Sequence, residues 1–179
     1  MILTDITILT EIKKGSIIVD PFSLDMLGTN SIDLTLHPVY KVYKTTSYLD
    51  CRKDNECIEL VFPEHGFTLQ PGELYICRTS EYTETHEHVP LLSGKSSLAR
   101  LGLSVHVTAG FGDVGFCGTW TLEISVVKPL IIYPKMPIAQ IYYETISEKP
   151  LKPYNLKESA KYNNQRSAET SKMYLNFKQ

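Results

Sequence analysis

The sequence predicts a mainly β domain built from short strands, with one helix in front of them. Short runs of branched and aromatic residues recur along the chain, and turn residues such as Pro71-Gly72 separate them. These runs do not alternate with helical patterns, which excludes a parallel α/β sheet. Many short strands at this spacing are typical of a sandwich or a small barrel. We expect residues 1–179 to form one domain with its own core.

The first predicted element is a helix at the N-terminus. Asp5 can cap it, and Gly15 can end it because glycine readily adopts a left-handed backbone. Between these two residues, apolar side chains recur on one helical face: Ile6, Ile8, Leu9 and Ile12. The helical period disappears after Gly15.

Short strands are predicted along most of the remaining chain. The runs with strand composition are 32–36, 39–43, 67–69, 73–78, 103–108, 118–126, 130–133 and 138–144. The charged run 83–88 (TETHEH) is predicted to be a solvated loop. Residues 154–179 are polar, and this composition predicts either a loose tail or a segment that becomes ordered over a ligand.

Composition and charge restrict the function classes. A formal net charge of -2 argues against a general nucleic-acid binder, which usually has a basic surplus. No apolar run reaches the length of a membrane helix, and the N-terminus lacks the pattern of a signal peptide. The cysteines are scattered without C-x-x-C pairing: Cys51, Cys57, Cys77 and Cys117. Together these features predict reduced thiols in a cytoplasmic protein that binds no nucleic acid and no membrane.

Residues 93–100 (SGKSSLAR) contain the Gly-Lys-Ser of a phosphate-binding P-loop. The second glycine that this motif needs is replaced by Val89, and Pro90 follows it. The loop therefore cannot form the glycine-assisted cradle of backbone N–H groups, and a P-loop is excluded. The residue types still suit an anion.

The same stretch predicts one helical turn over residues 96–100. Ser96 and Arg100 would then share a face at i and i+4. Leu98 and Leu101 could anchor the turn in the core, and Gly102 could end it with a left-handed backbone.

The strand 118–126 contains a carboxylate at its centre. Alternation places Trp120, Leu122 and Ile124 on one face, and it places Thr121, Glu123 and Ser125 on the other. Glu123 would face solvent if its side of the sheet is wet. If that side is enclosed, Glu123 needs a partner, and Arg100 is a candidate that would make the pair a tuned general base.

Two further patterns between these stretches admit more than one interpretation. Asp113 lies in the glycine-rich stretch 105–118 and could be a turn former in a hairpin or a ligand of a sugar hydroxyl. His106 suits a packed strand residue better than a catalyst. The run His86-Glu87-His88 lacks the downstream P-C-x-x-C of zinc-dependent nucleoside deaminases, so we expect no catalytic zinc.

Three blocks of this chain resemble the dCTP deaminases, which are relatives of the trimeric dUTPases. Residues 94–123 (GKSSLARLGLSVHVTAGFGDVGFCGTWTLE) look like the core signature of the family. Residues 29–36 resemble its N-terminal strand motif, and residues 152–165 (KPYNLKESAKYNNQ) resemble its nucleotide-covering tail. The chain departs from the pattern at Lys95, where an arginine is common, and in GFGDVGF, where a bulkier residue and a proline often flank the aspartate.

The resemblance implies a dUTPase-like distorted β-barrel and a role for each matching residue. Glu123 would take a proton from water, held by Ser96, Arg100 and the carbonyl of Ala109. Lys95, Ser97, Lys161 and Gln165 would bind triphosphate, and Asp113 would bond the deoxyribose 3′-hydroxyl. The backbones of Thr121 and Leu122 would meet the pyrimidine, and Tyr154 would lie against the nucleotide. Leu98 and Ala99 complete the implied substrate-binding run.

The implied activity is deamination of dCTP to dUTP and ammonia. Mg²⁺ would be bound through the substrate phosphates, without protein side chains and without zinc. The implied assembly is a homotrimer with active sites between subunits, residues 154–179 would cover the nucleotide, and dTTP is a candidate inhibitor. Two alternatives remain: a bifunctional enzyme that forms dUMP and diphosphate, and a non-catalytic β-domain that senses deoxynucleotides. The simultaneous presence of Ser96, Arg100 and Glu123 argues against the second alternative.

Overall fold

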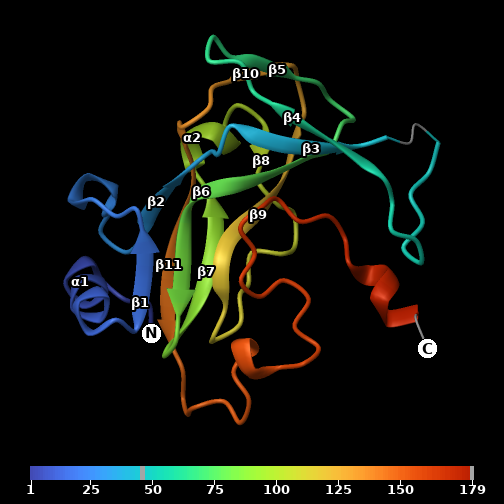
Figure 1. Ribbon diagram of the computed structural model, residues 1–179. Helices are drawn as coiled ribbons and strands as arrows, with labels where there is room; N and C mark the ends of the chain where they lie inside the picture. The colour runs from blue at the N-terminus through green and yellow to red at the C-terminus, as the bar shows by residue number, and fades with distance from the viewer. Residues whose placement is uncertain (45–46, 178–179) are drawn as a thin grey trace.

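The computed structural model describes residues 1–44 and 47–177. Its helical segments are α1 (Asp5–Lys14), η1 (Leu24–Met26), α2 (Ser96–Ala99), η2 (Tyr154–Leu156) and η3 (Met173–Phe177). Helix α1 lies beside strand β1, and η3 lies at the opposite end of the molecule (Figure 1). None of the described helices has the length and apolar character needed to cross a membrane.

The strands form three antiparallel sheets. The strands are β1 (Ile17–Asp20), β2 (Ile32–Thr35), β3 (Val39–Tyr43), β4 (Cys57–Val61), β5 (Phe67–Leu69), β6 (Tyr75–Thr85), β7 (His88–Gly94), β8 (Leu103–Ser104), β9 (Cys117–Val126), β10 (Leu130–Ile132) and β11 (Pro137–Thr145). The largest sheet has the order β4-β3-β6-β9-β8, with β1 also paired to β6. Strands β2-β11-β7 and β10-β5 form the other two sheets, so the described residues make no single closed barrel.

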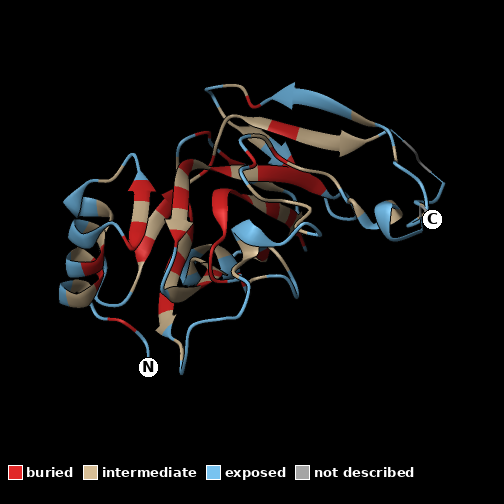
Figure 2. Cartoon of the chain, turned by 60° about the horizontal axis from the view of Figure 1, so that its bottom comes forward, coloured by how far each residue is buried: buried red, intermediate tan, exposed pale blue. Residues whose placement is uncertain are grey.

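One hydrophobic core connects the two larger sheets. Fully buried side chains come from β2 (Ile32, Leu34), β9 (Leu122, Ile124) and β11 (Ile141). Each such side chain stabilises the fold by about 1.5–3 kcal/mol relative to an exposed one. Buried residues follow the strands, while the loops and the outer side of α1 are largely exposed (Figure 2). The core therefore fixes β9 from one face and leaves its other face free for chemistry.

The predicted mainly β fold with one N-terminal helix is confirmed. Gly15 ends α1 with φ 77° as predicted, and Gly102 follows α2 with φ 83°. The cap of α1 differs from the prediction, because Thr4 is the N-cap and Asp5 is the first helical residue. The Asp5 carboxylate accepts the Ile6 N–H at 2.8 Å.

Three further local predictions are wrong. The strand expected over 103–108 stops at Ser104, because the chain then folds back onto β7, where the Leu92 N–H donates to the Gly110 carbonyl at 2.7 Å. The run 83–88 is not a solvated loop, since Thr83 and Thr85 are buried in β6. Strands β1, β4 and β7 were not predicted. Leu101 is 57% exposed and does not anchor α2, whereas Leu98 packs against the core as expected.

The C-terminal segment packs on the rest of the chain instead of lying free, and its residues Asn164 and Gln165 pair with β9. The Asn164 N–H donates to the Cys117 carbonyl at 2.7 Å, and the Thr119 N–H donates to the Gln165 carbonyl at 3.0 Å. All four cysteines are free, and burial raises the pKa of Cys77 and Cys117. Cys51 is exposed.

Candidate active site

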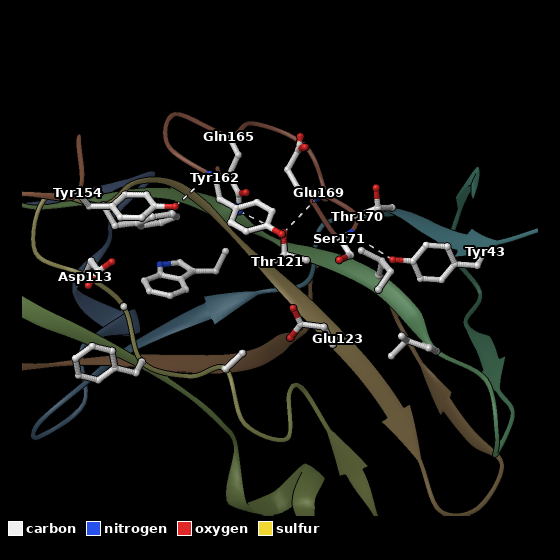
Figure 3. A pocket seen from close by; sticks show the side chains of 17 residues that line it. Tyr43, Asp113, Thr121, Glu123, Tyr154, Tyr162, Gln165, Glu169, Thr170 and Ser171 are labelled. Carbon is white, nitrogen blue, oxygen red and sulfur yellow. Dashed lines mark hydrogen bonds between the residues drawn. The ribbon is translucent and has the colours of Figure 1, made fainter. Parts of the chain in front are cut away.

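A pocket of about 530 Å³ opens between β9, the loop after β8 and the C-terminal tail (Figure 3). Strands β3 and β6 close its far side. Its lining residues are Tyr43, Leu74, Ile76, Ala109, Phe111, Gly112, Asp113, Phe116, Trp120, Thr121, Glu123, Tyr154, Tyr162, Gln165, Glu169, Thr170 and Ser171. The volume is in the range of pockets that hold small molecules. The resemblance gave a role to six of these residues: Ala109, Asp113, Thr121, Glu123, Tyr154 and Gln165.

Glu123 projects into this pocket from the middle of β9. The strand buries Leu122 and Ile124 on its core face, so alternation turns Glu123 to the other face, as predicted. No ion pair joins Glu123 to a described residue. Burial raises the pKa of Glu123, and its backbone hydrogen bond and the charge of His106 oppose this shift. A half-buried carboxylate that forms no ion pair and has a raised pKa is a stronger base than an exposed one, which suits it to proton transfer.

The edge of β9 beside Glu123 is open. The tail pairs with β9 at Gly118, and β8 pairs with it again at Ser125 and Val126. Between these contacts, the stretch Thr121–Glu123 has no described strand beside it on this side, while β6 pairs along the other. Backbone N–H and C=O groups on an unpaired edge are available to a flat ligand that carries donors and acceptors.

The tail forms one wall of the pocket and is fastened to it through side chains. Figure 3 shows Tyr154, Tyr162, Gln165 and Glu169 around the opening. The Tyr154 hydroxyl accepts the Tyr162 N–H at 3.1 Å, and the Thr121 hydroxyl accepts the Glu169 N–H at 3.2 Å. The tail therefore shares Thr121 with the strand that carries Glu123.

Gln165 connects the tail to β9 through its amide. Its Nε2 donates to the Thr119 carbonyl at 2.6 Å and to Thr121 Oγ1 at 3.2 Å. Both amide N–H bonds are thus used within the chain, and Oε1 has no partner among the described residues. Gly118 permits this contact, because a Cβ at its φ of 150° would lie 3.0 Å from the Gln165 side chain. The triphosphate contact implied for Gln165 stays a prediction.

Asp113 lies at the other end of the pocket, in a turn. The Phe116 N–H donates to the Asp113 carbonyl at 3.1 Å, so Asp113 is a turn former as one interpretation held. Its carboxylate is half exposed, faces the pocket, and lies 3.9 Å from Lys157 Nζ. It can therefore also accept a hydrogen bond from a ligand hydroxyl.

The α2 turn is separate from the pocket within one chain. Ser96, Ser97 and Arg100 are exposed, and Arg100 forms no ion pair with a described carboxylate. Lys95 makes a short hydrogen-bonded ion pair with Asp33. The prediction that Arg100 could partner Glu123 is therefore wrong within a single chain. The α2 turn, which joins β7 to β8, exposes Arg100 to solvent and does not line the pocket.

The side chains of two other implied ligand residues, Leu122 and Lys161, do not line the pocket. The Leu122 side chain is fully buried on the core face, so only its backbone can take part, as the resemblance implied. Lys161 Nζ donates to Asn176 Oδ1 at 2.6 Å and does not line the cavity. Among the described residues, no group of three or more His, Cys, Asp or Glu side chains is arranged to hold a metal ion.

Several lining residues were not predicted, among them Trp120, Tyr162 and Glu169. Alternation assigned Trp120 to the core face, and its burial agrees with that, yet one part of the indole borders the pocket. Tyr162 lies in the tail motif AKYNNQ and could have been found there, whereas no sequence signal marked Glu169.

Comparison with protein families and curated relatives agrees with the motifs. A family model described as dCTP deaminase-like matches residues 2–146. The dUMP-forming dCTP deaminase of Clostridium botulinum (strain Alaska E43 / Type E3) is 48% identical over 177 residues, which is 99% of each chain. The dUMP-forming dCTP deaminase of Cytophaga hutchinsonii is 48% identical over 166 residues, 92% of this chain and 93% of that one.

A solved structure shares the fold. The 2′-deoxycytidine 5′-triphosphate deaminase from Agrobacterium tumefaciens superposes with a TM-score of 0.59 and 19% sequence identity. The match covers 81% of this chain and 48% of that one. At this identity the likeness supports the architecture, and the site must be argued from the residues of this chain.

Proposed function

Because the chain belongs to the dCTP deaminase-like family, we propose that it hydrolyses dCTP to dUMP, diphosphate and ammonia. The observation that carries the proposal is Glu123, a half-buried carboxylate with a raised pKa that faces the pocket beside an open strand edge. The dUMP-forming outcome is supported by the names of the relatives that match over nearly the whole chain. Release of dUTP is the alternative outcome of the same first step.

In the first step, water adds to C4 of cytosine. Glu123 takes one proton from the water and delivers it to N3. It then takes the second proton from the new C4 hydroxyl and delivers it to the leaving amine, so that ammonia departs and a carbonyl forms at C4. The raised pKa helps the first transfer, because a carboxylate with a low pKa is too weak a base to take a proton from water. The open edge from Thr121 to Glu123 would hold the pyrimidine, with the Ala109 carbonyl near the water.

The second step cleaves the triphosphate. A second water would attack the α-phosphorus of dUTP, releasing diphosphate and leaving dUMP. Mg²⁺ would arrive with the triphosphate, where it offsets the charge of the phosphate oxygens. Asp113 would hold the deoxyribose 3′-hydroxyl through both steps. It lines the pocket, and its own loop is fixed to β7 by backbone hydrogen bonds. The contacts of Lys161 and Gln165 with phosphate, and inhibition by dTTP, remain parts of this proposal.

The site would be completed by a second copy of the chain. Ser96 and Arg100, the residues implied to hold the attacking water, lie on an exposed turn away from the pocket of their own chain. In a homotrimer, α2 of one subunit would meet the pocket of its neighbour. A cyclic assembly repeats such a contact in every subunit, which would give three equivalent sites.

Product analysis tests the proposed function. The purified protein is incubated with dCTP and Mg²⁺, and ammonia, dUTP, dUMP and diphosphate are followed over time. We expect dUMP and diphosphate to appear without a dUTP phase. Accumulation of dUTP would replace the dUMP-forming outcome by simple deamination. Binding of dCTP without release of ammonia would refute the enzymatic proposal and favour a nucleotide-sensing domain.

A further inference from the structure

Gly112 is required by space and not by backbone conformation. It precedes Asp113 in the loop before β9, and its φ is not positive. A Cβ at this position would lie 2.5 Å from Cη2 of Trp120 and 2.9 Å from Cγ of Pro90. Carbon atoms in contact normally stay about 3.5–4.0 Å apart. The indole of Trp120 therefore occupies the volume that a side chain at position 112 would need.

Trp120 is held firmly in this place. Its Nε1–H donates to the Thr83 hydroxyl at 2.9 Å, and its backbone N–H donates to the Thr79 hydroxyl at 3.0 Å. The Phe116 ring packs against it with centroids 4.7 Å apart. Because the only polar atom of the indole is already bonded, the part of the ring that borders the pocket offers carbon atoms alone.

This carbon surface lies next to the aspartate that is proposed to bind the sugar. Trp120 contacts Gly112. Asp113 is the residue directly after Gly112, and consecutive Cα atoms are about 3.8 Å apart. Trp120 and Asp113 both line the same pocket. When the 3′-hydroxyl of a deoxyribose bonds Asp113, C2′ and C4′ are the two carbons next to C3′, and either of them can be turned toward the indole.

We propose that Trp120 is a specificity-determining residue that favours 2′-deoxyribonucleotides by presenting a carbon surface to C2′. The inference rests on the proposed function and deepens it. A 2′-hydroxyl placed against the indole loses its water and gains no hydrogen-bond partner, which carries a free-energy cost. The hydrogen of a deoxyribose carries no such cost. An apolar wall of this kind discriminates against an added hydroxyl by up to about 10².

The contact between Gly112 and Trp120 also accounts for the glycine at position 112, which departs from the family pattern. The resemblance leads us to expect a bulkier residue beside the aspartate, where this chain has Gly112. Here the bulk comes from β9, since Trp120 fills the space above the glycine. The apolar wall at the sugar end is thus built from the strand instead of the loop.

Substitution at position 120 tests the inference. We measure kcat/KM for dCTP and CTP in the wild type, Trp120→Thr and the matched control Trp120→Phe. Trp120→Thr provides room and a hydroxyl partner, so the preference for dCTP over CTP should fall roughly tenfold, with kcat/KM for CTP rising. Trp120→Phe keeps a flat carbon surface and should hold the preference within about threefold. An equal loss for both substrates in Trp120→Thr would overturn the inference and leave Trp120 a packing residue.

Substrate analogues test it on the unaltered chain, should Trp120→Thr fail to fold. Fluorine at C2′ donates no hydrogen bond and loses little hydration, so 2′-fluoro-2′-deoxy-CTP should be used far better than CTP. Rejection of the fluoro compound as strong as that of CTP would contradict the carbon-surface explanation. Failure to turn over dCTP at all would instead refute the proposed function, so the two failures are distinguishable.

Discussion

Two glutamates that the fold shields from water have opposite electrostatic environments. Glu11 of α1 is 6% exposed, and Lys14 Nζ lies 2.6 Å from its Oε1, while the Ser16 hydroxyl makes a short hydrogen bond to Oε2. These contacts lower the pKa of Glu11 to about 2, although burial opposes them. Glu123 forms no ion pair with a described residue, and burial raises its pKa although the charge of His106 opposes the shift. Burial alone therefore does not decide the charge state of either group.

The difference separates a structural carboxylate from a chemical one. Glu11 has hydrogen-bonding partners within a few residues, and its lowered pKa keeps it ionised at neutral pH. Glu123 retains unused capacity and faces a pocket, which is the arrangement that proton transfer needs. If the proposed trimer forms, the partners that Glu123 lacks would come from a second chain.

The largest expected effect is that of Glu123→Gln. The amide keeps the shape of the side chain and cannot take a proton from water, so kcat for ammonia release should fall by roughly 10³-fold. Binding of dCTP, measured by calorimetry, should remain. The free energy of unfolding should stay the same or rise slightly, since a partly desolvated charge has been removed. Near-normal turnover in this variant would refute the role of Glu123 as general base.

Mixing two inactive variants tests whether the missing partners of Glu123 come from a second subunit. Glu123→Gln and Arg100→Ala chains are each expected to be inactive, and we would co-express them in equal amounts. If the site combines Glu123 of one subunit with Arg100 of another, about a quarter of the sites in a randomly mixed ring have both intact residues. Recovery of about a quarter of wild-type activity is expected, against none if each chain supplies both residues. Light scattering on the same sample would report the number of subunits.

Sequence reasoning reached the parts of the site that depend on local pattern. Alternation along 118–126 placed Glu123 on the free face, and the tail motif located Tyr154 and Gln165, which the structure brings to the pocket. Spacing along the chain could not show that α2 faces away from Glu123, because that depends on how β7 and β8 are joined. It also missed the proposed role of Trp120, because the contact with Gly112 depends on how the loop before β9 folds back against that strand.

A smaller effect is expected for Glu11→Gln, and it acts on stability instead of catalysis. At pH 7 the variant should lose about 1–3 kcal/mol in the free energy of unfolding, measured with urea, because Lys14 and Ser16 lose a charged partner. A lowered pKa contributes stability above about pH 4.5, and this contribution disappears as the pH falls through about 2. The difference between wild type and variant should therefore shrink toward zero in acid, while kcat at pH 7 is unchanged.

Glu56→Gln is the matched control for Glu11→Gln, since Lys44 Nζ lies 2.9 Å from the Glu56 carboxylate in an exposed ion pair. Solvent screens that pair, so its loss should destabilise the protein much less than the loss of the Glu11 pair. Equal destabilisation by the two substitutions would show that burial adds nothing to the ion pair of Glu11. In that case Glu11 and Glu123 would differ only in their hydrogen-bonding and charged partners, and the burial of the two side chains would not contribute to the difference.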